Sequence, residues 1–220
     1  MFSFKKRVVM ARGRSPGYDG QREAILEQAA QLFAERGYAG TSMNEVAEAC
    51  GMSKPSLYHY FRDKYALLFS IAEGHVTRLE VVVEEVRAET LDPRARLERL
   101  IRRFVEEYAG AQHAHRVLTG DVRYLEDGDR ERILEVERRV VAGFAKAIAE
   151  LRPEVEEAHL AKPLTMLLFG MINWMFTWLK PDGNLSYEAM APIVADLFFG
   201  GIPAVRLPNA EAARGDADSP

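Results

Sequence analysis

The stretch from Thr41 to Lys64, TSMNEVAEACGMSKPSLYHYFRDK, constrains the fold of this chain more than any other. Ser42 followed by Glu45 reads as a capping box, which predicts the start of a helix. Gly51 lies where a sharp turn favours a residue that tolerates positive φ, and Ser53 can cap the next helix. Two short helices joined by a tight turn form a helix-turn-helix, whose second helix fits the major groove of DNA.

The second of these helices is predicted to have one buried and one exposed face. Pro55 is tolerated in its first turn, where backbone N–H groups have no intrahelical partner. Leu57 and Phe61, four residues apart, lie on the buried face. We expect hydrogen-bond donors on the exposed face to reach bases, and the helix starts to reach phosphates. The candidate DNA contacts are Thr41, Ser42, Ser53, Lys54, Pro55, Ser56, Tyr58, His59 and Tyr60, of which Tyr60 can equally belong to the core.

Charge is distributed unevenly along the chain. The net charge is −4, which taken alone argues against nucleic acid. Residues 1–64 hold 10 of the 29 basic and 7 of the 33 acidic residues, a surplus of three positive charges; the remainder has a surplus of seven negative ones. A basic N-terminal unit on an acidic body is typical of a DNA-binding module joined to a separate domain, although chance asymmetry would look the same.

The chain shows no sign of export or membrane insertion. Its single cysteine, Cys50, excludes a disulfide within the chain and fits a reducing compartment. The N-terminal residues lack the apolar run of a signal peptide. The most apolar stretch, Leu164 to Leu179, is too short to span a bilayer and is interrupted by Asn173 and two threonines. We therefore expect a cytoplasmic protein without membrane contact.

Helical periodicity continues through the rest of the chain, and no strand alternation or internal repeat is found, so the predicted fold class is all-α. Residues 1–19 are predicted to be a disordered basic arm, 20–66 a three-helix DNA-binding domain, 67–201 a helical-bundle ligand-binding and dimerisation domain, and 202–220 a disordered tail. Helices are expected at 21–36, 64–89, 92–111, 129–151, 155–180 and 186–199, with helical turns in 113–126 and a turn at 181–184.

Residues 22–68 resemble the DNA-binding domain of the TetR family of bacterial transcription regulators. The run SLYHYFRDKYALL is the most specific part of the resemblance. It implies a repressor that binds a palindromic operator as a homodimer, and it places Lys64 for a phosphate contact. Pro55 departs from the small residue common at that site, which we expect to change base preference. The matching residues are Arg22, Ile25, Ala29, Ala30, Leu32, Phe33, Gly37, Thr41, Val46, Ala47, Gly51, Ser53, Leu57, Tyr58, Phe61, Lys64 and Leu67.

The apolar segment Leu164 to Leu179 and the last helix are predicted to be shared between a core, a dimer interface and a pocket. Apolar residues surround both helices, so each must be buried on more than one side. A four-helix dimer interface is expected from Leu167, Met171, Trp178, Met190, Ile193, Val194, Leu197 and Phe198; a monomer core is the alternative. Candidate effector contacts are Phe104, Tyr108, Tyr124, Phe144, Met166, Gly170, Asn173, Trp174 and Thr177, with core packing as the competing interpretation.

The effector is expected to be small and largely hydrophobic. The segment from Leu167 to Ala191 is similar to TetR-family members that control fatty-acid, aromatic-acid or steroid breakdown, which implies an acyl-CoA thioester as effector. Its phosphates would need arginines at the pocket mouth, and Arg116, Arg123 and Arg138 are the candidates, with a solvated charged face as the favoured competing interpretation for each.

No catalytic set and no cofactor site is predicted. His113 and His115 are too few for a metal site and are expected on the surface. The rival functions are a helical-bundle ligand carrier and an interaction scaffold, neither of which would bind DNA.

Overall fold

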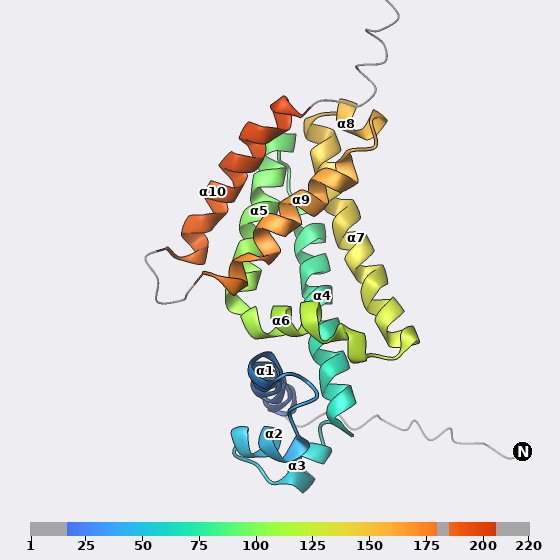
Figure 1. The fold of residues 1–220 in the computed structure, drawn as a ribbon, viewed down its shortest axis with the longest axis vertical. Coiled ribbons are helices and arrows are strands. Elements are labelled where there is room, and N and C mark those ends of the chain that lie inside the picture. The colour runs from blue at the N-terminus through green and yellow to red at the C-terminus, as the bar shows by residue number, and fades with distance from the viewer. Residues whose placement is uncertain (1–16, 180–184, 206–220) are drawn as a thin grey trace, which may run out of the picture.

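The computed structural model describes residues 17–179 and 185–205, and within them every regular element is a helix (Figure 1). The all-α prediction is confirmed. A head is formed by α1 (Tyr18–Arg36), α2 (Met43–Ala49) and α3 (Lys54–Tyr58). The body contains α5 (Pro93–Gly110), α6 (Gln112–Gly120), η1 (Val122–Tyr124), α7 (Asp127–Leu151), α8 (Glu154–Glu157), α9 (Ala161–Asn173), η2 (Met175–Thr177), α10 (Tyr187–Gly201) and η3 (Ile202–Ala204).

Helix α4 (Lys64–Ala88) joins the two parts, because it starts in the head and runs deep into the body (Figure 1). Asp63 caps it by accepting a hydrogen bond from the Ala66 N–H at 2.7 Å, as predicted. Inside the body α4 lies beside α5 and α7. Gly143 allows α7 to approach, since a Cβ at that position would overlap Val83 of α4.

One apolar core holds the head together and extends past it. Leu57 and Phe61 pack with the stripe of α1, as the periodicity predicts. The same cluster continues along α4 to Val76 and takes in residues of the body, so the predicted border at residue 66 falls inside a continuous helix and core. The cluster includes Ile25, Ala29, Phe33, Val46, Leu67, Leu68, Ile71, Val117, Leu118, Leu125 and Ile133.

The single helix predicted over 155–180 is wrong, because the chain turns sharply after α8. His159 adopts φ 57°, Leu160 N–H donates to the Val155 carbonyl at 2.7 Å, and His159 N–H donates to the Glu156 carbonyl at 3.0 Å. This pattern is a Schellman motif, which ends a helix through a left-handed residue. Helix α9 then crosses the bundle in a new direction and ends at Asn173 (Figure 1).

The two ends of the described chain also correct the predicted boundaries. Helix α1 begins at Tyr18, preceded by Gly17 at φ 99°, so the last residues assigned to the basic arm are helical. Ile202 is buried and starts η3, so the predicted tail begins later than residue 202. The remainder of the arm, most of the tail and the 181–184 turn lie outside the described residues. Over the described ranges, no helix is both long and apolar enough to span a bilayer.

Candidate DNA-binding surface and effector cavity

The short helix α3 stands at the outer end of the head, away from the body (Figure 1). Ser53 Oγ accepts a hydrogen bond from the Ser56 N–H at 3.3 Å and lies 2.9 Å from Ser56 Oγ. Pro55 occupies the first turn, and the fully buried Leu57 anchors the helix in the head core. The Ser53 hydroxyl therefore caps the helix, and the Ser56 hydroxyl bonds to that cap.

Three donor side chains of the predicted set are exposed on and just after α3: Lys54, Tyr58 and His59. Tyr58 keeps 44% of its surface exposed, a large fraction for an aromatic residue. Tyr60, by contrast, is half-buried and stacks on Tyr18 with ring centroids 4.8 Å apart. The geometry thus separates the ambiguous Tyr60 from the three exposed donors, whose contact with DNA stays a prediction.

At the start of α2 the structure divides the two candidate phosphate contacts. Thr41 is 2% exposed, and its hydroxyl donates to the carbonyls of Gly37 at 3.0 Å and Leu32 at 3.4 Å. Its predicted role as a hydroxyl donor to phosphate is wrong, because the hydroxyl already satisfies buried carbonyls. Ser42 is exposed and forms the predicted capping box with Glu45, whose pKa is lowered chiefly by the Ser42 hydrogen bonds.

Lys64 also has an internal role. Its ammonium donates to the carbonyls of Tyr38 and Thr41, each at 2.7 Å, and lies 4.4 Å from the centre of the Tyr38 ring. The expected phosphate contact is not what this geometry provides, because the charge is directed at main-chain oxygens of the loop before α2. Lys64 thereby fastens the start of α4 to the head.

Tyr124, predicted to contact an effector, lies instead at the junction of head and body. It is 41% exposed and its ring centroid is 5.3 Å from that of Tyr38. Nearby, the Tyr38 N–H donates to Asp121 at 3.3 Å, and the Tyr65 hydroxyl donates to Asp129 at 2.8 Å. These contacts join the head to η1 and α7, and Tyr124 is not among the residues that line the body cavity.

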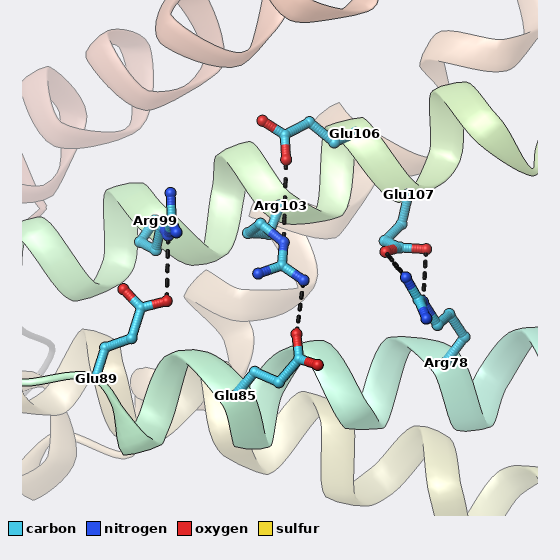
Figure 2. Close-up of polar contacts among 7 residues, drawn as sticks. All are labelled: Arg78, Glu85, Glu89, Arg99, Arg103, Glu106 and Glu107. Atoms are coloured by element: carbon cyan, nitrogen blue, oxygen red, sulfur yellow. Dashed lines mark hydrogen bonds and ion pairs between the residues drawn. The ribbon is translucent and has the colours of Figure 1, made fainter.

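A row of ion pairs links α4 to α5 on the body surface (Figure 2). Arg78 donates to both carboxylate oxygens of Glu107 at 3.0–3.1 Å, the bidentate arrangement. Further along, Arg103 pairs with Glu85 at 2.7 Å and Arg99 with Glu89 at 3.3 Å. Solvent-accessible pairs of this kind contribute about 0.2–1 kcal/mol each, so the row adds modestly to the packing of α4 on α5.

A cavity of ≈150 Å³ lies inside the body where α4, α5, α6, α7 and α9 meet. Of the nine predicted effector residues, three line it: Tyr108, Met166 and Asn173. The Tyr108 hydroxyl donates to Asn173 Oδ1 at 2.8 Å. The full lining is Val76, Leu79, Tyr108, His115, Leu118, Thr119, Glu137, Val140, Val141, Met166, Phe169 and Asn173.

The other predicted effector residues lie elsewhere. Phe104 and Phe144 are fully buried and pack against each other at 4.6 Å, so they belong to the core. Gly170, Trp174 and Thr177 are exposed on the outer side of α9 and η2, and Trp174 is 65% exposed. The competing core interpretation is thus correct for the two phenylalanines, while the outer residues face away from the cavity.

Two buried histidines stand beside the cavity, and periodicity alone did not single them out. His75 Nε2 of α4 lies 3.2 Å from His115 Nδ1 of α6. Burial lowers the pKa of His75 to about 4, and burial together with the neighbouring His75 lowers that of His115 to about 3. Both imidazoles are therefore neutral at pH 7. His113, by contrast, is exposed, so the expected surface position is right for His113 and wrong for His115.

An open groove of ≈640 Å³ between α7 and α9 adjoins this cavity. Glu137, Val141 and Met166 line both spaces. Burial raises the pKa of Glu137, which favours its neutral form. Three cations border the groove: Arg138, Lys146 and Lys162. Of the arginines suggested for a pocket mouth, Arg138 is so placed, whereas Arg123 lies over the Tyr124 ring and Arg116 lines neither space.

Large apolar side chains are exposed on α9, on α10 and on either side of η2. Leu167, Trp174 and Leu197 are each 65% exposed, Trp178 is 51% and Ile193 is 41%. Met171 is half-buried. Three residues predicted for the dimer interface point the other way: Met190, Val194 and Phe198 are buried in the core of their own chain. The apolar α10 sequence could not separate these two faces because both are apolar.

Two family models match the chain in agreement with this division. The model described as "Bacterial regulatory proteins, tetR family" matches residues 25–71, and "Tetracyclin repressor-like, C-terminal domain" matches residues 90–202, which is more than half of the chain.

The chain belongs to the TetR family.

Relatives of known name support this membership over most of the chain. The HTH-type transcriptional repressor KstR2 of Rhodococcus jostii is 34% identical over 192 residues, covering 84% of this chain and 93% of the relative. A TetR-family regulator from Bordetella parapertussis is 35% identical with a TM-score of 0.78, covering 84% and 97%. AibR, solved in complex with isovaleryl coenzyme A and operator DNA, is 29% identical with a TM-score of 0.68, covering 80% and 97%.

Membership in the TetR family makes this protein a transcription regulator that binds DNA, and not an enzyme. The helix-turn-helix of the TetR match is the α2–α3 unit, and the C-terminal match contains most of the cavity lining and the exposed α9–α10 face. The carrier and scaffold alternatives are thereby set aside.

Proposed function

We propose that this protein is a homodimeric repressor, acting in the cytoplasm, that binds a palindromic operator and is released by a small, largely hydrophobic effector such as an acyl-CoA thioester. The observation that carries the proposal is the course of α4. This one helix is fastened to the head through Lys64 and lines the body cavity through Val76 and Leu79. A change in the cavity can therefore reach the DNA-binding surface through a single rigid element.

The first part of the proposal, operator binding, rests on α3. Lys54, Tyr58 and His59 provide donors at the outer end of the head, where a major groove can accept a short helix. Ser42 adds an exposed hydroxyl at the start of α2. One such head makes few base contacts, so specificity requires two of them, spaced about 34–36 Å or a multiple apart on a palindrome.

The second part, dimerisation, rests on the exposed surface of α9 and α10. Helices α9 and α10 contact each other, and exposed apolar side chains on neighbouring helices of a soluble protein mark an interaction site. The side chains that would enter the interface are Leu167, Met171, Trp174, Trp178, Ile193 and Leu197. A symmetric pairing of these two helices with their copies makes a four-helix interface, in which the same patch serves both subunits.

The third part, effector binding, rests on the cavity and the adjoining groove. An acyl chain suits the inner space, which is largely apolar, while the cations of Arg138, Lys146 and Lys162 suit the phosphates of coenzyme A. The relative AibR, whose complex contains isovaleryl coenzyme A, supports this class of effector. The named function of KstR2 supports repression. An effector shifts the balance between DNA-bound and free forms only by its difference in affinity for the two.

The test is a mobility-shift titration of the full chain against its own promoter region at fixed salt. We expect Lys54→Ala and Tyr58→Ala each to weaken binding about 5- to 100-fold, the loss of one or two good contacts. Arg102→Ala, an exposed residue of α5, serves as the matched control with unchanged affinity. Undiminished binding by the Lys54 and Tyr58 variants would contradict the assignment, and acyl-CoA thioesters that fail to release the DNA would contradict the effector.

A further inference from the structure

Polar side chains from four helices meet on one side of the body cavity. They are His75 of α4, Tyr108 of α5, His115 of α6 and Asn173 of α9. His75 and His115 share a 3.2 Å contact, Tyr108 stacks on His115 with centroids 4.0 Å apart, and Tyr108 donates to Asn173 at 2.8 Å. The Tyr108 stack and the His75 contact hold the His115 ring, and the Tyr108–Asn173 hydrogen bond holds Tyr108 in turn.

One atom of this cluster is unsatisfied. His115 is 2% exposed, and its Nε2 has no hydrogen-bond partner among the described residues. Burial and then the neighbouring His75 lower the pKa of His115, and the Asn173 carbonyl acts in the opposite direction without reaching hydrogen-bond geometry. An orphaned buried nitrogen costs about 1–3 kcal/mol, and native proteins rarely keep one without a ligand or an ordered water. Because His115 lines the cavity, an occupant can supply the missing partner.

We propose that His115 Nε2 donates a hydrogen bond to the carbonyl oxygen of a short acyl group held in the cavity, and that the His115–His75 contact transmits this to α4. This inference rests on the proposed function and deepens it. A cavity of ≈150 Å³ suits a group about the size of benzene, because a cavity of that volume lined by apolar residues is known to bind benzene. The acyl end of the effector is therefore short, and the His115 imidazole recognises its carbonyl oxygen through a hydrogen bond.

The transmission follows from the tautomers of two neutral imidazoles, each of which has one donor and one acceptor. When Nε2 of His115 donates to a carbonyl, Nδ1 must accept, and Nε2 of His75 must donate to it. A hydroxyl, which can donate as well as accept, would be compatible with either tautomer. His75 also lines a groove between α1 of the head and α4 and α6. A change in the His75 tautomer therefore takes place where the head meets the body.

Two probes that differ only in the carbonyl test this inference: isovaleryl-CoA, a thioester, and the matching isopentyl-CoA thioether. Binding to the full chain is measured by calorimetry. We expect the wild type to bind the thioester about 5- to 150-fold more tightly, equivalent to one buried hydrogen bond of about 1–3 kcal/mol. His115→Leu should bind both probes equally. His115→Gln, which keeps a donor, should restore part of the preference, a rescue that a purely packing role would not give.

A second readout is the tautomer itself. Nitrogen-15 NMR of the histidine rings should show a proton on Nε2 of both His75 and His115 in the thioester complex. His75→Gln should keep the probe preference but reduce the release of operator DNA by isovaleryl-CoA. Thermal unfolding and DNA binding without probe establish that each variant is folded.

The outcomes separate the two proposals. Equal wild-type affinity for the two probes would overturn the role of His115 and leave the acyl-CoA effector standing. Binding of neither probe would overturn both. Nε2 without a proton in the thioester complex would overturn the hydrogen-bond direction, and unchanged release by His75→Gln would overturn the transmission to α4.

Discussion

In the head, polar side chains sit at helix ends or on the surface, and those that are buried are satisfied; Thr41 and Lys64 both direct their donors at main-chain carbonyls. In the body, by contrast, His115 keeps an orphaned nitrogen beside a cavity. The head is thus complete as a monomer, whereas the body retains unmet hydrogen-bonding and apolar surface. This difference suggests that the head supplies a fixed shape and that the body is the part that changes with its partners.

The contrast between head and body fails if the exposed face of α9 and α10 needs no partner. We expect Leu197→Glu to place a charge inside the proposed dimer interface, convert the protein to a monomer and weaken operator binding on the order of 100-fold, because the second head no longer binds in the same event. Sedimentation equilibrium and a mobility-shift titration measure the two effects. Val81→Glu, an exposed apolar residue of α4, is the control. A Leu197 variant that stays dimeric would remove this interface.

The buried histidine pair gives the next effect, a dependence of stability on pH. The pKa values of His75 and His115 are lowered to about 4 and about 3 in the folded chain, whereas an unfolded histidine titrates near 6.5. Between these values the unfolded state binds more protons, so stability is lost as pH falls below ~6.5. At pH 5 the loss should be roughly 2 kcal/mol for each histidine.

Urea unfolding at pH 7 and pH 5 measures this loss, with the His75→Gln/His115→Gln double variant as reference. Glu137, whose pKa burial raises, acts with the opposite sign but is present in both proteins and cancels. Equal pH dependence in the two proteins would show that the pair is not buried and neutral as described.

Lys64 gives the smallest expected effect and sharpens the description of the head. Lys64→Met keeps the apolar stem and removes the ammonium that bonds to the carbonyls of Tyr38 and Thr41. We expect a loss of about 1.5–3 kcal/mol in the free energy of unfolding, the range for hydrogen bonds to a charged group. Lys54→Met, at an exposed position, should change stability by less than about 0.5 kcal/mol. If the Lys64 variant weakens DNA binding without loss of stability, its role is the phosphate contact after all.

The helix-turn-helix could be predicted from the sequence because its determinants are local. The capping box at Ser42, the cap at Ser53 and the Leu57–Phe61 stripe each lie within four residues, so spacing alone identifies them. The same holds for the cap of α4 at Asp63. Where spacing is uninformative the prediction failed: α10 is apolar on both faces, so Met190, Val194 and Phe198 could not be told from Leu197.

What the sequence determined by itself was the all-α class, the DNA-binding unit and the order of the helices as far as α7. Only the tertiary structure decided which polar groups meet. His75 and His115 are 40 residues apart, and Tyr108 and Asn173 are 65 apart, so no periodic pattern relates them. The tertiary structure also directs the Thr41 hydroxyl and the Lys64 ammonium at main-chain carbonyls. The physical reason is that a helix face is set by local spacing, whereas the partner of a buried donor is set by how whole helices pack.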